Sequence, residues 1–353
     1  MNMIRFLKDW TLPVAIAMGT ASYLTFRYVP QLDALGTALA PWFDFLFPLT
    51  VFLTLFVTFC KVDFHQMRPH RWHVGILAAQ LLLVALNVAI IFWLQSTFNP
   101  QPSALSPQPS ALSLQPSALS PQPSALSLQP SALHSPLLWE AVLTCIIGPA
   151  ASASPVVVGK LGGNISTMTT YVLISSLASA LMIPMVFPML EQTVHADFMQ
   201  AFLVILQKVS IVLLLPLASG WLMQHFARPL CARIAARPNL GFYCWGVSLS
   251  ITTGITVKNI VDSGAAPALL AAIAVATLVL CFVQFGLGRM VGSHLGEEVN
   301  AGQALFQKNT ALSIWVAYMY LNPVASIGAG CYVLWQNIIN SLELYYYKTK
   351  RHL

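Results

Sequence analysis

The chain has 353 residues, of which 57% are hydrophobic and only 8% are charged. Soluble domains carry roughly 25% charged residues, so this composition excludes an ordinary soluble domain and indicates an integral membrane protein. We assign the net charge of +6 to cytoplasmic loops rather than to a nucleic-acid surface, because aromatic residues do not interleave a basic stripe anywhere.

Apolar runs of about 20 residues, the length that crosses a hydrocarbon core of about 30 Å, recur along the whole chain. Ten of them predict membrane helices at 11–28, 42–60, 74–97, 138–159, 165–190, 198–224, 239–260, 265–292, 302–320 and 322–346. The first run has no small-residue cleavage site before the next polar loop. We therefore interpret it as a retained helix and not as a signal peptide.

The basic residues give these helices an orientation. Placing the amino terminus in the cytoplasm puts most of the 17 Lys and Arg residues on the cytoplasmic side, in keeping with the positive-inside rule. With ten spans the carboxyl terminus is cytoplasmic as well. We expect a multi-pass protein of the bacterial inner (plasma) membrane.

A low-complexity segment separates the third and fourth predicted helices. Residues 101–133 repeat the unit QPSALS followed by Pro or Leu, with a period of seven. A proline in every unit blocks a coiled coil, so we expect a flexible, uncharged loop on the outer side. Two interpretations remain open, namely tandem duplication without a transport role and a binding arm.

The remaining sequence divides into two halves of five helices. Because five is odd, the halves enter the membrane in opposite orientations, which predicts an inverted repeat in which the fourth helix corresponds to the ninth. The predicted fold class is an all-α membrane protein with ten transmembrane helices and two five-helix inverted repeats. Helices four and nine are expected to be discontinuous and to cross.

The fourth predicted helix contains several backbone breakers at membrane depth. Pro149 and Pro155 each remove a backbone donor, and Gly148 relaxes the chain before them. The small residues 150–154 allow another helix to cross closely. One interpretation is a crossing with free carbonyl and hydroxyl groups, and the alternative is a simple proline kink.

The ninth predicted helix carries an unusual concentration of polar side chains: Gln303, Gln307, Lys308, Asn309 and Thr310. Polar side chains inside a membrane face a partner helix or water, so this segment favours a solute site. In the alternative, the helix begins later and Lys308 extends to the cytoplasmic interface.

At these two segments the chain resembles the bile acid:sodium symporter family. The fourth-helix stretch 148–157, GPAASASPVV, is similar to the family's small-residue motif, and 308–312, KNTAL, is similar to its ninth-helix core. The helix count, termini and inverted halves agree along the whole chain except the repeat loop.

The resemblance implies two groups of helices, a panel and a core. Broken core helices cross beside bound sodium, the organic anion binds between core and panel, and alternating access moves one against the other. The implied divisions are 1–73 (panel helices one and two), 74–97 (core helix three), 98–137 (repeat loop), 138–190 (core helices four and five), 191–262 (panel helices six and seven) and 263–353 (core helices eight to ten).

The family's sodium ligands are only partly present. Ser152 and Ser154 belong to the motif, but Pro155 stands where the family has asparagine. On the fifth helix the hydroxyl ligands are replaced, although Thr169 and Thr170 lie one or two residues away. On the third helix, Gln80 or Asn87 is expected to reach the crossing, as a third-helix glutamine does in the family.

The ninth helix departs furthest from the family pattern. Ala304 occupies the place of an acidic residue and Lys308 the place of a glutamine. Two cations a few ångströms apart repel by several kcal/mol at an effective dielectric near 20. We therefore hypothesise that the Lys308 ammonium replaces a sodium ion, which would make transport sodium-independent, or proton-coupled if burial favours the neutral amine.

Other function classes receive less support from the sequence. No catalytic constellation, phosphate loop or metal motif is recognised, so we expect neither an enzyme nor a resident cofactor. Cys145 leaves open an arsenite-type or proton-coupled efflux carrier of related fold. We expect His70 and His73 to be solvated in a cytoplasmic loop, and Glu343 to lie in the final turn of helix ten. The expected partners are a small organic anion, with sodium or a proton as coupling ion, and lipid.

Overall fold

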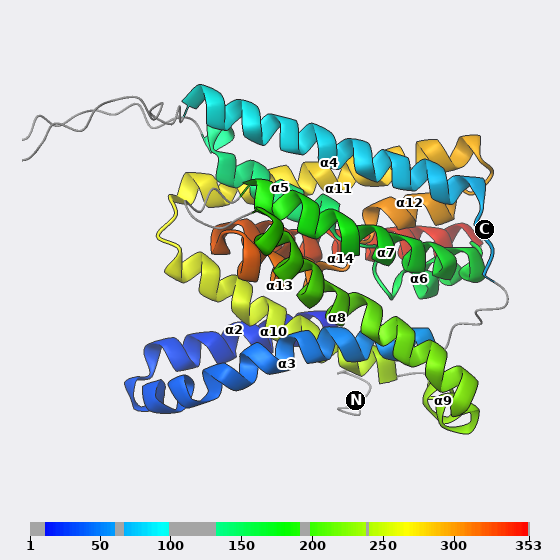
Figure 1. Cartoon of the computed structure of the whole chain (residues 1–353), viewed down its shortest axis with the longest axis horizontal. Coiled ribbons are helices and arrows are strands. Elements are labelled where there is room, and N and C mark those ends of the chain that lie inside the picture. Colours follow the sequence, from blue (N-terminus) through cyan, green and yellow to red (C-terminus); the bar gives the residue numbers. More distant parts are fainter. Residues whose placement is uncertain (1–10, 61–66, 99–131, 191–197, 238–239, 352–353) are drawn as a thin grey trace, which may run out of the picture.

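The structure is a computed structural model that describes residues 11–60, 67–98, 132–190, 198–237 and 240–351, and this part is almost entirely α-helical (Figure 1). The stretch 101–131 of the repeat segment lies outside the described residues, so the expectation of a flexible outer loop is untested. The same holds for the first ten residues and for His65.

Eight long helices account for most of the described residues. They are α2 (Thr11–Tyr28), α3 (Asp33–Cys60), α4 (Arg71–Phe98), α7 (Ile165–Leu190), α8 (Phe198–Phe226), α10 (Leu240–Asp262), α11 (Pro267–His294) and α14 (Pro323–Arg351). Each begins and ends close to a predicted span, except that α3 starts nine residues before the predicted residue 42.

Shorter helices fill the intervals between the long ones. They are η1 (Pro30–Leu32), η3 (Ala132–His134), α5 (Pro136–Ile147), α6 (Ser154–Lys160), α9 (Arg228–Ala235), α12 (Glu298–Phe306) and α13 (Thr310–Tyr320). The sequence analysis did not predict α9. The fourth and ninth predicted helices are each present as two pieces, α5 with α6 and α12 with α13.

Four helices of the described part are long and apolar enough to cross a membrane by length and composition: α4, α7, α8 and α11. Such helices satisfy their own backbone groups, as a segment in hydrocarbon must. The chain is therefore an all-α integral membrane protein.

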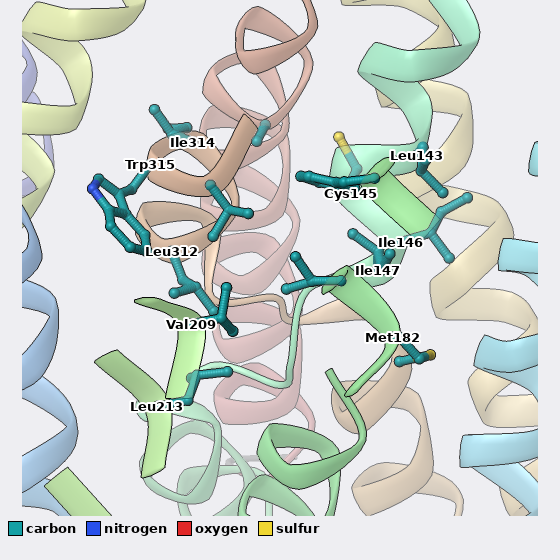
Figure 2. Close-up of a cluster of buried hydrophobic side chains, with 14 of the residues drawn as sticks. Leu143, Cys145, Ile146, Ile147, Met182, Val209, Leu213, Leu312, Ile314 and Trp315 are labelled. Carbon is teal, nitrogen blue, oxygen red and sulfur yellow. The ribbon is translucent and has the colours of Figure 1, made fainter. Parts of the chain in front are cut away.

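The helices pack in two regions that meet along one side (Figure 1). In the first region α2 and α3 pack on α10, and α3 also packs on α8. In the second region α5 packs on α4 and α14, while α11 packs on α12 and α14. A large apolar cluster joins side chains of α5, α8 and α13, with Met182 of α7 beside them (Figure 2).

Close backbone approach holds α5 against α14. A Cβ atom at Gly328 of α14 would overlap the carbonyl oxygen of Ala141 on α5. Helical backbone cannot yield as a flexible side chain can, so we expect Gly328→Ala to lower the free energy of unfolding by about 1–3 kcal/mol. Thermal unfolding of the purified protein measures this loss.

The matched control for that substitution is Gly286→Ala on α11. A Cβ atom at Gly286 would meet nothing within 4 Å, and alanine is the better helix former. Equal stability of the two variants would contradict the proposed contact between α5 and α14.

One histidine lies elsewhere than expected. His73 is buried in the first turns of α4, where its Nε2 is 3.0 Å from the carbonyl oxygen of Thr167 and its Nδ1 accepts from the backbone N–H of His70. The expectation that His73 is solvated in a loop is therefore wrong. His73 instead connects the start of α4 to the start of α7.

Candidate functional site

The two broken segments meet at their breaks. The connector between α5 and α6 lies antiparallel to the connector between α12 and α13, with Ala150 opposite Lys308. The Ala151 N–H donates to the Gln307 carbonyl at 2.8 Å, and the Asn309 N–H donates to the Pro149 carbonyl at 2.9 Å. Each connector thus satisfies backbone groups that the helix ends leave unpaired. We call this meeting point the junction (residues 148–153 and 307–309).

Prolines explain why the first segment breaks where it does. A proline cannot donate a backbone hydrogen bond and its ring clashes with the preceding turn, so α5 cannot continue through Pro149. Pro155 lies in the first turn of α6, a position where its missing donor costs little. In the second segment, the Asn309 side chain caps α13 by accepting from the Leu312 N–H.

Side chains of α4 and α7 complete the first connector. Gln80 of α4 donates to the carbonyls of Ile146, at 2.9 Å, and Gly148, at 3.1 Å. On α7, Ser179 donates to the Ile147 carbonyl at 2.8 Å, and Ser175 accepts from the Ala150 N–H at 3.1 Å. The unpaired groups of this break are therefore bonded within the protein.

Side chains of α14 perform the same task for the second connector. The Tyr332 hydroxyl donates to the Phe306 carbonyl at 2.7 Å, and the Gln336 Oε1 accepts from the Lys308 N–H at 3.1 Å. Gln284 of α11 in turn donates to the Tyr332 hydroxyl at 2.9 Å. The sequence analysis missed Ser175, Ser179, Tyr332 and Gln336. Their only signal was a polar group inside an apolar run, which marks a residue that faces the bundle interior.

Lys308 is the most unusual residue of the junction. Only 1% of its surface is exposed, which rules out a side chain that extends to the interface. Its Nζ atom has no hydrogen-bond partner, and the ion pairs of the described residues do not include it. The Oε1 of Gln307 and the Oγ atoms of Ser154 and Ser313 are also buried without partners. The junction thus presents uncompensated polar groups around one cationic side chain.

A cavity of about 580 Å³ reaches the junction. Its walls come from α3 and α10 on one side and from α6, α7, α13 and α14 on the other, and they include both Gln307 and Lys308. Neither Asp nor Glu lines it. A cavity with lysine and amide side chains but no carboxylate is suited to a solute with negative charge.

Several predicted site residues line this cavity. Ser152, Pro155, Thr169, Asn309 and Thr310 do so together with Gln307 and Lys308. The Thr169 hydroxyl donates to the Ile165 carbonyl of its own helix, at 2.7 Å. Helices α6, α7 and α13 therefore bring these residues to one space.

The other predicted residues take different places. Ser154 is buried at the start of α6, and Thr170 is buried with its hydroxyl on the Ser166 carbonyl. Gln80 reaches the junction, as described above. Asn87 lies two turns further along α4, where its Oδ1 is buried without a partner among the described residues.

Gln303 belongs to a polar cluster on the far side of α12. Its Nε2 is 3.0 Å from Asn340 Oδ1 and 2.6 Å from Glu343 Oε2, and Glu343 also pairs with Arg289. Arg289 is 3.0 Å from a carboxylate oxygen of Glu298 as well. Since α14 continues to Arg351, Glu343 is not in its final turn, contrary to expectation.

At the end of α10 that follows the cavity, contacts close the space between the two packing regions. Asn259 of α10 donates to the Ser326 hydroxyl of α14 at 2.6 Å, and both residues are buried. One turn away from the core face, the Lys258 ammonium lies 5.8 Å from the centre of the Tyr318 ring. The cavity is therefore bounded at this end by direct contacts between α10 and the helices α13 and α14.

No cysteine cluster accompanies the junction. Cys145 is buried, and its thiol donates to the Ala141 carbonyl at 3.3 Å. Within the described ranges, no group of three or more His, Cys, Asp or Glu side chains could hold a metal ion.

Comparison with known proteins gives one match. The model of the Sodium Bile acid symporter family matches residues 124–263, which span α5 to α10 and include the first break. A search of curated proteins found no match. The resemblance inferred from the sequence motifs is confirmed over the matched residues, while the second break lies beyond them.

Proposed function

Because the chain belongs to the sodium bile acid symporter family, we propose that it is a secondary active transporter that moves a small organic anion by alternating access, with Lys308 in the place of one sodium ion. The observation that carries the proposal is the Lys308 Nζ, buried at the junction of two broken helices without a partner. An uncompensated buried charge is costly, and an anion bound beside it removes that cost.

The chemistry of the site supports an ammonium in place of sodium. Sodium requires a cage of oxygen atoms, and the family's acidic residue is Ala304 here, fully buried among apolar neighbours. A sodium ion near a charged Lys308 would be repelled by several kcal/mol at an effective dielectric near 20. Gln307 and Ser154 still offer buried oxygens without donors, which is the remnant expected of such a cage.

The helix arrangement supports a division into core and panel. We propose that α4 to α7 and α11 to α14 form the core, and that α2, α3, α8 and α10 form the panel. Each broken segment is supported by side chains of the helix before it and the helix after it, the pattern expected of two inverted halves of five spans. The termini would then be cytoplasmic, in a bacterial inner membrane.

The cavity supports alternating access between these two parts. It lies between α3 and α10 of the panel and α6, α13 and α14 of the core, and it extends to Lys160 at the end of α6. The opposite end is closed by the Asn259–Ser326 hydrogen bond. In the proposed orientation this is a state open to the cytoplasm and closed to the outside.

The test of this function is uptake into proteoliposomes that contain the full chain. We expect saturable uptake of radiolabelled organic carboxylates, unchanged when sodium is replaced by choline at constant ionic strength. Binding of the transported anion should also raise the unfolding temperature by mass action. Sodium-dependent uptake would reject the role of Lys308, and absence of any anion uptake or binding would reject the transporter.

A further inference from the structure

The cavity wall carries two positive charges and no negative one. Lys308 and Lys160 both line it, while Asp, Glu and Arg are absent from the lining. The proposed function uses only Lys308. The second lysine bears on which anion the site would take, an inference that rests on that proposed function.

The two lysines lie at opposite ends of the cavity. The hydrogen bond from the Ala151 N–H to the Gln307 carbonyl places the chain just before α6 beside the junction. From there, Lys160 is the last residue of α6 and is exposed. At 1.5 Å of rise per helical residue, the two lysine backbones are separated by about 10 Å or slightly more.

Between the two lysines the wall is polar but uncharged. Asn309, Asn340 and Ser341 contribute amide and hydroxyl groups there. The nearest carboxylate of α14, Glu343, is held by Arg289 and Gln303 and does not line the cavity. The positive charge of the two lysines is therefore not balanced by acidic residues on the wall.

We propose that the transported substrate is an organic dianion whose two negative groups are about 10 Å apart. One group lies at the junction beside Lys308, and the other reaches the mouth of the cavity at Lys160. Lys160 thus determines specificity between monovalent and divalent anions. Lys308 supplies the charge that both kinds of anion require.

The experiment compares straight-chain monocarboxylates with dicarboxylates of equal carbon number, by thermal shift of the purified full chain at low ionic strength. Because a partly exposed ion pair contributes up to about 1 kcal/mol, we expect the best dicarboxylate to bind roughly two- to fivefold tighter than its monocarboxylate. The preference should peak at a chain length that places the carboxylates about 10 Å apart, and it should weaken at high salt.

Variants separate the two lysines. Lys160→Gln should equalise the affinities for the two kinds of anion, and Lys160→Arg should retain the preference. Lys208→Gln, which removes an exposed lysine of α8 outside the cavity, is the matched control and should also retain it. Lys308→Gln should weaken the binding of both.

The outcomes distinguish the specificity from the function. Equal binding of monocarboxylates and dicarboxylates by the unmodified protein overturns the dianion and leaves the anion transporter intact. A preference that survives Lys160→Gln also overturns it. If neither kind of carboxylate binds, the proposed function fails together with this inference.

Discussion

Lys308→Gln is expected to reduce anion uptake at least about tenfold in sodium-free buffer, because it removes one member of a buried charge pair formed with the substrate. Added sodium should restore part of the uptake. Gln307, Ser154 and the new glutamine would offer oxygen ligands to a sodium ion, and the ammonium that repels such an ion would be gone. Uptake into proteoliposomes across a sodium series measures both effects.

Two further variants serve as controls for this result. Lys208→Gln removes one positive charge from the exposed surface of α8 and should leave uptake and its ion dependence unchanged. Lys308→Arg retains the charge and should remain independent of sodium, even if its larger group slows transport. The same ion dependence in Lys308→Gln as in the unmodified protein would show that Lys308 does not replace an ion.

Gln80→Leu is expected to cause the second large effect, a loss of stability together with uptake. The substitution leaves the carbonyls of Ile146 and Gly148 without their side-chain donor, in a part of the protein from which water is excluded. Each buried carbonyl without a partner costs about 1–3 kcal/mol. Thermal unfolding, and the fraction of protein that elutes as a single species in detergent, report the loss.

Asn87→Leu provides the matched control on the same helix. Asn87 is also a buried amide of α4, but its Oδ1 has no hydrogen-bond partner among the described residues. Replacing an unpaired polar group by an apolar one of similar size is neutral or stabilising. If Gln80→Leu and Asn87→Leu behaved alike, the support of the first connector by Gln80 would be disproved.

The positions of the helices and of both breaks follow from local chemistry, and the sequence was sufficient to predict them. Pro149 and Pro155 exclude a continuous helix whatever surrounds them, and polar residues from Gln303 to Thr310 cannot face lipid. Family membership followed from the same two segments. The start of α3 was less accessible, because polar and apolar residues alternate between Asp33 and Trp42.

The supports of the junction depended on tertiary packing and could not be predicted. Ser175 and Ser179 are single hydroxyls in an apolar run, and only the position of α7 shows that they bond to the first connector. Glu343 resembles a residue near a chain end, yet Arg289 from α11 pairs with it. His73 is buried for a similar reason, since α7 approaches the start of α4.

The antiparallel contact between the two connectors determines which parts of the protein are able to separate. Two backbone hydrogen bonds, from Ala151 to Gln307 and from Asn309 to Pro149, join chain segments that are more than 150 residues apart. Rotation of one broken segment must therefore carry the other with it as a rigid body. An anion held beside Lys308 would be released by a widening gap to α3 and α10, while the residues that grip it keep their mutual geometry.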